Sequence, residues 1–286
     1  MLLKLGNRDR ELITITREAV FAEHDKKTSK GKDMPRRRCF AQNSGLNKAK
    51  KIFSVPILSA KLIFEKDTGI KLFFKPEYGN YWRRCLTDDE IRQIELWEQQ
   101  NRRLVFLRDC LSLSVALDFN FVSKAGNYTV IGQWEHDAKT QQDNVAITEL
   151  AKETAQVIQN LPFYKDADYV CAVPPAPHKG FDLPSSVVAQ VSCGIGKSDI
   201  TSEFHFGGDK APVKDAGLAQ KWDIWENAVL SFKKNINGKT VVLVDNKYQA
   251  GVTLQYIAMK LQRAGAHEVY GLCFVKTWGD QDNQGR

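Results

Sequence analysis

One segment near the C-terminus combines an acidic residue, a glycine and a hydroxyl in an order that could hold a phosphate. It runs from residue 241 to 254 and reads VVLVDNKYQAGVTL. The apolar run predicts a buried strand, which a short loop would join to an amphipathic helix. Such a junction aims free main-chain N–H groups and the positive end of a helix dipole at one point. We therefore predict an anion site here, able to hold a dianionic phosphate without a lysine.

Three residues of this segment are suited to a sugar phosphate. Gly251 lets the backbone approach a ligand closely, and the Thr253 hydroxyl can donate to it directly. Asp245, at the carboxyl end of its strand, could accept hydrogen bonds from ribose hydroxyls. The alternative is structural: Asp245 would cap a turn, and the other two residues would only start a helix.

Two other phosphate motifs are excluded. Gly196-Lys197-Ser198 has Val191 where a P-loop needs its first glycine, and no Gly-x-Gly-x-x-Gly occurs. The segment from 241 to 254 is the phosphate-binding candidate that remains.

The chain from Asn144 onward alternates helices and strands regularly. Helices are expected at 147–158, 185–193 and 253–264, and strands at 169–173, 228–232, 240–244 and 268–275. Continuous β-branched strands alternating with helices predict an α/β fold, in which helices cover both faces of a parallel sheet.

The front of the chain has a different character. We expect a basic, flexible segment over residues 1–50, with a helix near 9–22, and an α+β accessory region over 51–144. The β-forming groups around Asp67-Thr68-Gly69 predict a hairpin, Thr87 begins a helix with a capping box, and 128–134 is strand-like. The α/β domain then occupies 145–286.

Charge is concentrated at this front. Residues 1–60 hold 14 Lys and Arg against 6 Asp and Glu, a local +8, whereas the whole chain carries +7. Such a stretch could meet RNA or DNA phosphates, and Trp82-Arg83-Arg84 could also touch nucleic acid. The alternatives are a solvated basic segment and an ordinary surface aromatic between solvated charges.

Three landmarks, in order over about 100 residues, resemble the type I phosphoribosyltransferase family. The segment from 241 to 254 is similar to that family's ribose-phosphate signature. Lys179-Gly180-Phe181-Asp182-Leu183 resembles an Arg-Gly-Phe-Asn-Gln stretch of the ComF-type branch. The third landmark resembles the Ala-Gly-Leu and Glu-Asn-Val elements of that branch and comprises Ala216-Gly217-Leu218, Glu226-Asn227-Ala228-Val229 and Phe232.

The resemblance implies a fold and a reaction. Members of the family transfer ribose 5-phosphate from phosphoribosyl pyrophosphate with the help of Mg²⁺. Phosphoribosyl pyrophosphate or a nucleotide is therefore the expected ligand. The metal is not expected to be held by protein side chains alone. Asp245, Asn246 and Lys179 would be the catalytic residues, with Asp245 holding the ribose hydroxyls. The 5-phosphate loop would be Gln249, Ala250, Gly251, Val252 and Thr253; the pyrophosphate loop Ala176, Pro177 and His178 with Lys179; and the lid Lys210 or Lys214.

Three departures from this family's pattern leave two functions open. The second acid of the signature is Asn246, and Gln249-Ala250 replaces the usual pair of threonines, both of which lower the expected affinity for magnesium. The front also lacks the cysteine-rich zinc module usual in the ComF-type branch. The protein is therefore either a transferase or hydrolase of phosphoribosyl pyrophosphate, or a catalytically weakened effector or accessory subunit of a nucleic-acid complex, such as one for DNA uptake or defence.

The cysteines and the apolar runs limit the expected metal sites and the expected location of the protein. The six cysteines are widely separated, so a thiolate metal site is not expected. No apolar run approaches a membrane span, so we expect a cytoplasmic protein, with a protein partner as a further option. Glu135-His136-Asp137 is expected to be a turn rather than a metal site, and Trp222 and Trp225 to pack a helix rather than stack on a base.

Overall fold

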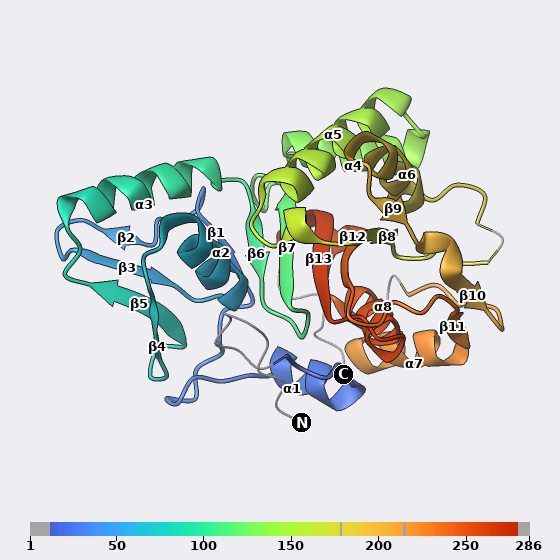
Figure 1. Ribbon diagram of the computed structural model, residues 1–286, viewed down its shortest axis with the longest axis horizontal. Helices are drawn as coiled ribbons and strands as arrows, with labels where there is room; N and C mark the ends of the chain where they lie inside the picture. Colours follow the sequence, from blue (N-terminus) through green and yellow to red (C-terminus); the bar gives the residue numbers. More distant parts are fainter. Residues whose placement is uncertain (1–11, 178, 214–215, 280–286) are drawn as a thin grey trace.

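A seven-stranded sheet forms the centre of the protein in the computed structural model, which describes residues 12–177, 179–213 and 216–279 (Figure 1). The strand order is β1-β6-β7-β13-β12-β8-β9. The strands from β7 to β9 are parallel, and β6 and β1 add antiparallel pairings at one edge. Their bounds are β1 Arg37–Cys39, β6 Val105–Leu107, β7 Leu113–Phe119, β8 Tyr169–Ala172, β9 Ser198–Asp199, β12 Thr240–Tyr248 and β13 Glu268–Lys276.

The central strands are buried on both faces. Every residue of β13 is buried, and in β12 only Thr240, Asn246 and Lys247 are partly exposed. In the parallel register Leu243 of β12 lies opposite Cys171 of β8, and Asp245 opposite Cys273 of β13. Runs of β-branched residues suit this double burial, and the expected α/β fold is confirmed.

Helices cover the two faces of the large sheet. Figure 1 shows α4, α5 and α6 on one side and α7 and α8 on the other, and α1 contacts α7 through Arg17 and Asp223. The bounds are α1 Arg17–His24, α4 Val130–Gln141, α5 Asn144–Asn160, α6 Leu183–Ile195, α7 Leu218–Asn227 and α8 Val252–Arg263. The expected helices of the α/β domain are therefore present, with α8 displaced by one residue.

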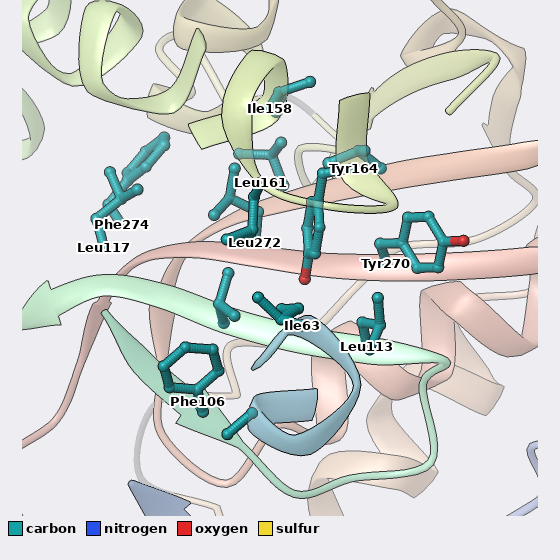
Figure 2. Packing of buried hydrophobic residues seen from close by; sticks show 14 of the residues in the cluster. Ile63, Phe106, Leu113, Leu117, Ile158, Leu161, Tyr164, Tyr270, Leu272 and Phe274 are labelled. Atoms are coloured by element: carbon teal, nitrogen blue, oxygen red, sulfur yellow. The ribbon is translucent and has the colours of Figure 1, made fainter. Parts of the chain in front are cut away.

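One apolar core joins the large sheet to the front of the chain. Figure 2 shows Leu113 and Leu272 of the sheet facing the region where Leu161 follows α5, with Ile63 from α2 beside them. The Tyr164 hydroxyl donates to the Gly271 carbonyl at 2.8 Å, which satisfies the polar end of a buried ring. The front region is thus packed onto the sheet rather than linked loosely to it.

The front region forms a second, antiparallel sheet of order β2-β3-β5-β4. Its strands are β2 Leu46–Asn47, β3 Ile52–Val55, β4 Phe73–Lys75 and β5 Asn80–Arg84, and its helices are α2 Leu58–Thr68 and α3 Asp88–Gln100. Phe53 and Val55 point to the helix side of this sheet, where they are fully buried. The capping box expected at Thr87 is confirmed, since its side chain and that of Glu90 each accept from the other's main-chain N–H.

The hairpin expected around Asp67-Thr68-Gly69 is wrong. Residues 58–68 form α2, which ends at Gly69 with φ 72°. The apolar run Leu62-Ile63-Phe64 is buried as one side of a helix, because consecutive apolar residues fit a buried helix as well as a strand. Packing against the two sheets selects the helix over the strand for these residues.

The strand expected at 128–134 is also wrong. Thr129 accepts from the Gly132 N–H and begins α4 at Val130. Gly132 lies so close to the Asn120 backbone that any side chain would overlap it, so the helix can approach only at a glycine. This correction matters for the site, because α4 carries a carboxylate towards it.

Two further expected elements are present, but with other bounds or other partners than expected. The helix expected near 9–22 is α1, Arg17–His24, and residues 1–11 lie outside the described part. The strand expected at 228–232 is β11, Leu230–Phe232, which pairs antiparallel with β10, Phe204–Phe206, outside the large sheet. The large sheet also takes β1, β6 and β7 from the first 144 residues, so it extends across the boundary expected at residue 145.

The basic front is partly used inside the fold. The Arg37 guanidinium lies 4.7 Å from the centre of the Phe119 ring, and Arg38 lies 5.1 Å from that of Phe40. Arg37 therefore holds the N-terminal segment against β7 of the large sheet, whereas Arg38 packs within that segment. No helix within the described ranges is long and apolar enough to cross a membrane.

Candidate functional site

The β12–α8 junction has the expected order of strand, loop and helix, with a shorter loop. β12 continues to Tyr248 because it keeps pairing with β13 as far as Lys276. Asn246 and Lys247 are therefore strand residues, and only residues 249–251 form the turn before α8 begins at Val252. A three-residue turn fixes the positions of its main-chain amides more tightly than a longer loop would.

Gly251 makes this turn possible. Its φ is 74°, a left-handed conformation that side chains disfavour, and a Cβ there would overlap the Tyr248 ring. The Tyr248 hydroxyl in turn donates to the Asp109 carboxylate at 3.1 Å. The turn thus rests on a buried aromatic ring that is itself held in place.

Main-chain N–H groups at the turn are available to a ligand. In the described part of the chain, those of Ala250, Gly251, Val252 and Thr253 have no hydrogen-bond acceptor. They belong to the first turn of α8, where the helix offers no acceptor and its dipole is positive. This arrangement is suited to a phosphate dianion.

Thr253 keeps a donor for that ligand. Its Oγ1 accepts from the Trp225 indole N–H at 3.1 Å. Because the acceptor side of the hydroxyl is used, its own proton can point elsewhere. Trp225 is 1% exposed and stacks on Tyr256, and Trp222 is equally buried, so the expectation that these rings pack a helix is confirmed.

A cavity of about 780 Å³ opens in front of this turn, at the carboxyl ends of β8 and β12. The loop after β8, the segment around Lys210 and helix α7 form its other walls. Among the expected site residues, those that line it are Ala176, Lys179, Lys210, Asp245, Asn246, Gln249, Ala250, Gly251, Val252 and Thr253. Pro177 does not line the cavity, and His178 and Lys214 lie outside the described residues.

Five lysines give the cavity a cationic lining. Lys179 lies 2.7 Å from Asp182 Oδ1, and Lys221 donates to Gln249 Oε1 at 3.1 Å. The Lys210 ammonium lies 4.3 Å from the centre of the Trp225 ring. Lys139 and Lys247 complete the set, and the carboxylates of the lining are Asp182 and Asp245. Cations exceed anions, so the cavity favours a ligand with several negative charges.

Asp245 is buried at the end of β12. Burial raises the pKa of this carboxyl to about 6, although its Oδ1 accepts from the Asn246 N–H at 2.8 Å. Asp182 raises the pKa further, and Lys139 and Lys179 lower it. The group is therefore ionised in the upper neutral range and could accept from ligand hydroxyls there.

Glu135 is a site residue that the sequence reasoning did not identify. It lies on α4, is 2% exposed, and accepts from Asn246 Nδ2 at 3.2 Å. Lys247 lies 3.2 Å and Lys139 3.8 Å from its carboxylate. A buried carboxylate from α4 thus lies beside residue 246, where it contacts the Asn246 amide and two lysines.

Glu135 could have been identified from the sequence if residues 130–141 had been predicted as a helix. Ile131, Glu135 and Ala138 share the buried side of α4, at the spacing of one helix face. His136 instead faces Tyr128, with a hydroxyl to Nδ1 distance of 3.1 Å, and Asp137 contacts Gln133. The turn expected at 135–137 is therefore wrong, because the three residues lie within a helix and point in different directions.

Comparison with known proteins adds little to this geometry. No family model matches the sequence, and no curated protein matches it. Among solved structures, one described as a glutamic acid mutant from an analysis of an invariant aspartic acid in HPRTs shares 14% identity, with a TM-score of 0.28, over 50% of this chain and 68% of the other. HPRT is a type I phosphoribosyltransferase. An overlap this weak establishes no family, so the assignment depends on the site.

Proposed function

We propose that the protein binds phosphoribosyl pyrophosphate, or a nucleoside 5-phosphate, in the cavity at the β12–α8 junction. The observation that carries this proposal is the turn at residues 249–251, whose unpaired N–H groups face a cavity lined by five lysines. The N–H groups suit a terminal phosphate, and the lysines suit the further charges of a pyrophosphate.

Each part of the ligand has a matching part of the cavity in this proposal. The 5-phosphate is held by residues 250–253, and the ribose hydroxyls donate to Asp245. The pyrophosphate lies against Ala176 and Lys179, and Lys210 closes over it from beside Trp225. Transfer at the ribose C1 needs a fixed sugar and a neutralised leaving group more than a strong nucleophile, which fits these residue types.

Magnesium stays a prediction. Among the described residues, no group of three or more His, Cys, Asp or Glu could hold a metal ion. The carboxylates of the cavity lining are also engaged by the protein: Asp245 is buried, and Asp182 is paired with Lys179, as Glu135 beside the cavity is with Lys247. These residues do not form a metal site by themselves, so we derive no step through the ion and assign neutralisation of the pyrophosphate to the lysines.

A catalytically weakened effector is the second candidate, and Asn246 favours it. This residue takes the place of the second acid of the phosphoribosyltransferase signature, and its amide is used in a hydrogen bond to Glu135. Such a protein would bind the same ligand and turn it over slowly. The ComF-type branch stays a prediction for both candidates.

Calorimetry with phosphoribosyl pyrophosphate tests binding, and ³¹P NMR of the same samples tests turnover. We expect wild-type protein to bind, and Thr253→Ala to weaken binding about tenfold, the range for one hydrogen bond to a charged group. Thr148→Ala, a partly exposed threonine on α5, is the matched control.

The two readouts separate the candidates. Release of pyrophosphate supports the transferase or hydrolase, whereas binding without release supports the effector. Absence of binding to phosphoribosyl pyrophosphate, ribose 5-phosphate and nucleoside 5-phosphates alike would remove both.

A further inference from the structure

The small antiparallel sheet has an outer face that no helix covers. Alternation along its strands puts Phe53 and Val55 on the helix side, so Ile52 and Ser54 lie on the opposite side. Ser54 is the register partner of Trp82, which is also the partner of Phe73. The outer face therefore carries an aromatic pair at the middle of β4 and β5.

Aromatic rings and cations alternate across this outer face. The Trp82 ring lies 5.3 Å from the Tyr78 ring, and the Arg84 guanidinium lies 5.3 Å from the Trp82 ring on β5. At the other end, the Lys30 ammonium lies 5.0 Å from the Tyr78 ring. Two of the rings remain accessible, because Phe73 is 59% and Tyr78 49% exposed, whereas Trp82 is half-buried. Exposed aromatics this close together mark an interaction surface.

The N-terminal loop holds Lys30 at this edge. The Ser29 N–H donates to the Pro76 carbonyl at 3.2 Å, which fixes the loop to the turn between β4 and β5. The loop cations next to it, Lys26 and Lys27, are paired with Glu23 and Asp33. Lys30 is thus placed over a ring rather than against a carboxylate.

Positive charge exceeds negative charge on this outer face. Among the described residues, Lys30, Lys75 and Arg84 form no ion pair, and Glu77 is the acid in the turn between β4 and β5. A partner with regularly spaced negative charges and flat apolar groups between them complements such a surface. Single-stranded nucleic acid has both, whereas a duplex hides its base faces.

We infer that the outer face of the small sheet, formed by Phe73, Tyr78 and Trp82 with Lys30, Lys75 and Arg84, is a binding surface for single-stranded nucleic acid. Bases stack on the exposed rings, and the cations follow the phosphates. The surface is separate from the β12–α8 cavity and does not depend on what that cavity binds.

Fluorescence anisotropy with labelled oligonucleotides of about 12 nucleotides tests this inference, a length within the range that one such surface covers. Oligo-dT and oligo-rU form separate arms, and a duplex of equal length forms a third. We expect both single strands to bind, the duplex to bind about tenfold more weakly, and Phe73→Ala and Tyr78→Ala each to weaken single-strand binding about fivefold to tenfold. Arg84→Glu should weaken it as well and reduce its dependence on salt.

Matched controls come from the loop before α4, outside the small sheet. Tyr128→Ala removes a partly exposed ring near α4, and Lys124→Glu reverses an exposed charge in the loop before it. Both should bind like wild type. The inference is overturned if Phe73→Ala and Tyr78→Ala bind single strands as tightly as wild type, if the duplex binds equally well, or if wild type binds neither single strand.

Discussion

The β12–α8 cavity and the outer face of the small sheet both carry excess positive charge, but they place it differently. In the cavity, Lys179 and Lys247 are set against Asp182 and Glu135, and the main-chain N–H groups beside them point at one spot. On the outer face, Lys30 and Arg84 lie over aromatic rings. Fixed point charges with converging donors suit a phosphate cluster, whereas rings between cations suit stacked bases.

The net charge of each region would not have identified the two candidate binding surfaces. The front carries the charge excess of the chain, yet Arg37 and Arg38 are used to pack the N-terminal segment. The later part of the chain has about −1 overall, yet it gathers five lysines around one turn. Local arrangement, not regional charge, separates the two surfaces.

The largest effect should come from Gly251→Ala. A side chain at this positive φ costs about 1–2 kcal/mol, and its overlap with the Tyr248 ring adds about 1–3 kcal/mol, so we expect the free energy of unfolding to fall by about 2–5 kcal/mol. Phosphate binding should weaken by more than tenfold, while oligonucleotide binding stays unchanged. Urea denaturation and calorimetry measure these effects.

Gly194→Ala on α6 is the control, because a Cβ there meets open space. It should leave ligand binding unchanged and stabilise the helix slightly. If Gly251→Ala is as stable as wild type and binds phosphate normally, the turn is not the constrained element described above.

Asp245→Asn should give the next largest effect, and that effect should depend on pH. The pKa of Asp245 is about 6 in the folded protein, above its ordinary value. The folded state therefore holds the proton more tightly, and the stability gained from it, at most about 3 kcal/mol, is lost as pH rises through about 6.

The Asn variant should accordingly gain stability relative to wild type between pH 5 and pH 8. Its binding of ribose 5-phosphate should be about tenfold weaker at pH 8, with a smaller difference at pH 5, where Asp245 is itself protonated. Melting curves and calorimetry at both pH values measure this, and a difference that does not change with pH would contradict the assignment. Asp137→Asn, on the exposed side of α4, is the matched control.

The smallest effect on ligand binding should come from Glu135→Gln. Whether this change strengthens or weakens pyrophosphate binding is what tests the role of Glu135. Removing this buried charge leaves Lys139 and Lys247 uncompensated, so pyrophosphate should bind about threefold to tenfold more tightly. The fold should lose about 1–2 kcal/mol, because the pairing with Lys247 is lost. Weaker pyrophosphate binding would indicate that Glu135 acts on the ligand through Asn246 rather than through charge.

Sequence reasoning succeeded where one pattern fits one structure. The apolar run before Asp245 and the amphipathic helix after Gly251 are found within a few residues of where they were expected. It failed at Leu62-Ile63-Phe64, whose consecutive apolar residues fit a strand and a buried helix equally well. The roles expected for Asp245 and Thr253 stay predictions.

Contacts between distant segments could not be read from the sequence. The hydrogen bond from Trp225 to Thr253 joins residues 28 positions apart, and the one from Asn246 to Glu135 spans 111 positions. No periodicity connects residues at such separations. Glu135 itself could have been predicted, but only if residues 130–141 had been assigned to a helix.

The most direct measurement is an NMR titration of backbone amides with ribose 5-phosphate. The account predicts that the amide signals of Ala250, Gly251, Val252 and Thr253 move most, with Asn246 and Lys179 following, and that signals from β4 and β5 stay in place. Saturating shifts confined to other parts of the chain, with those four amides unmoved, would contradict the claim that the β12–α8 turn is a phosphate site.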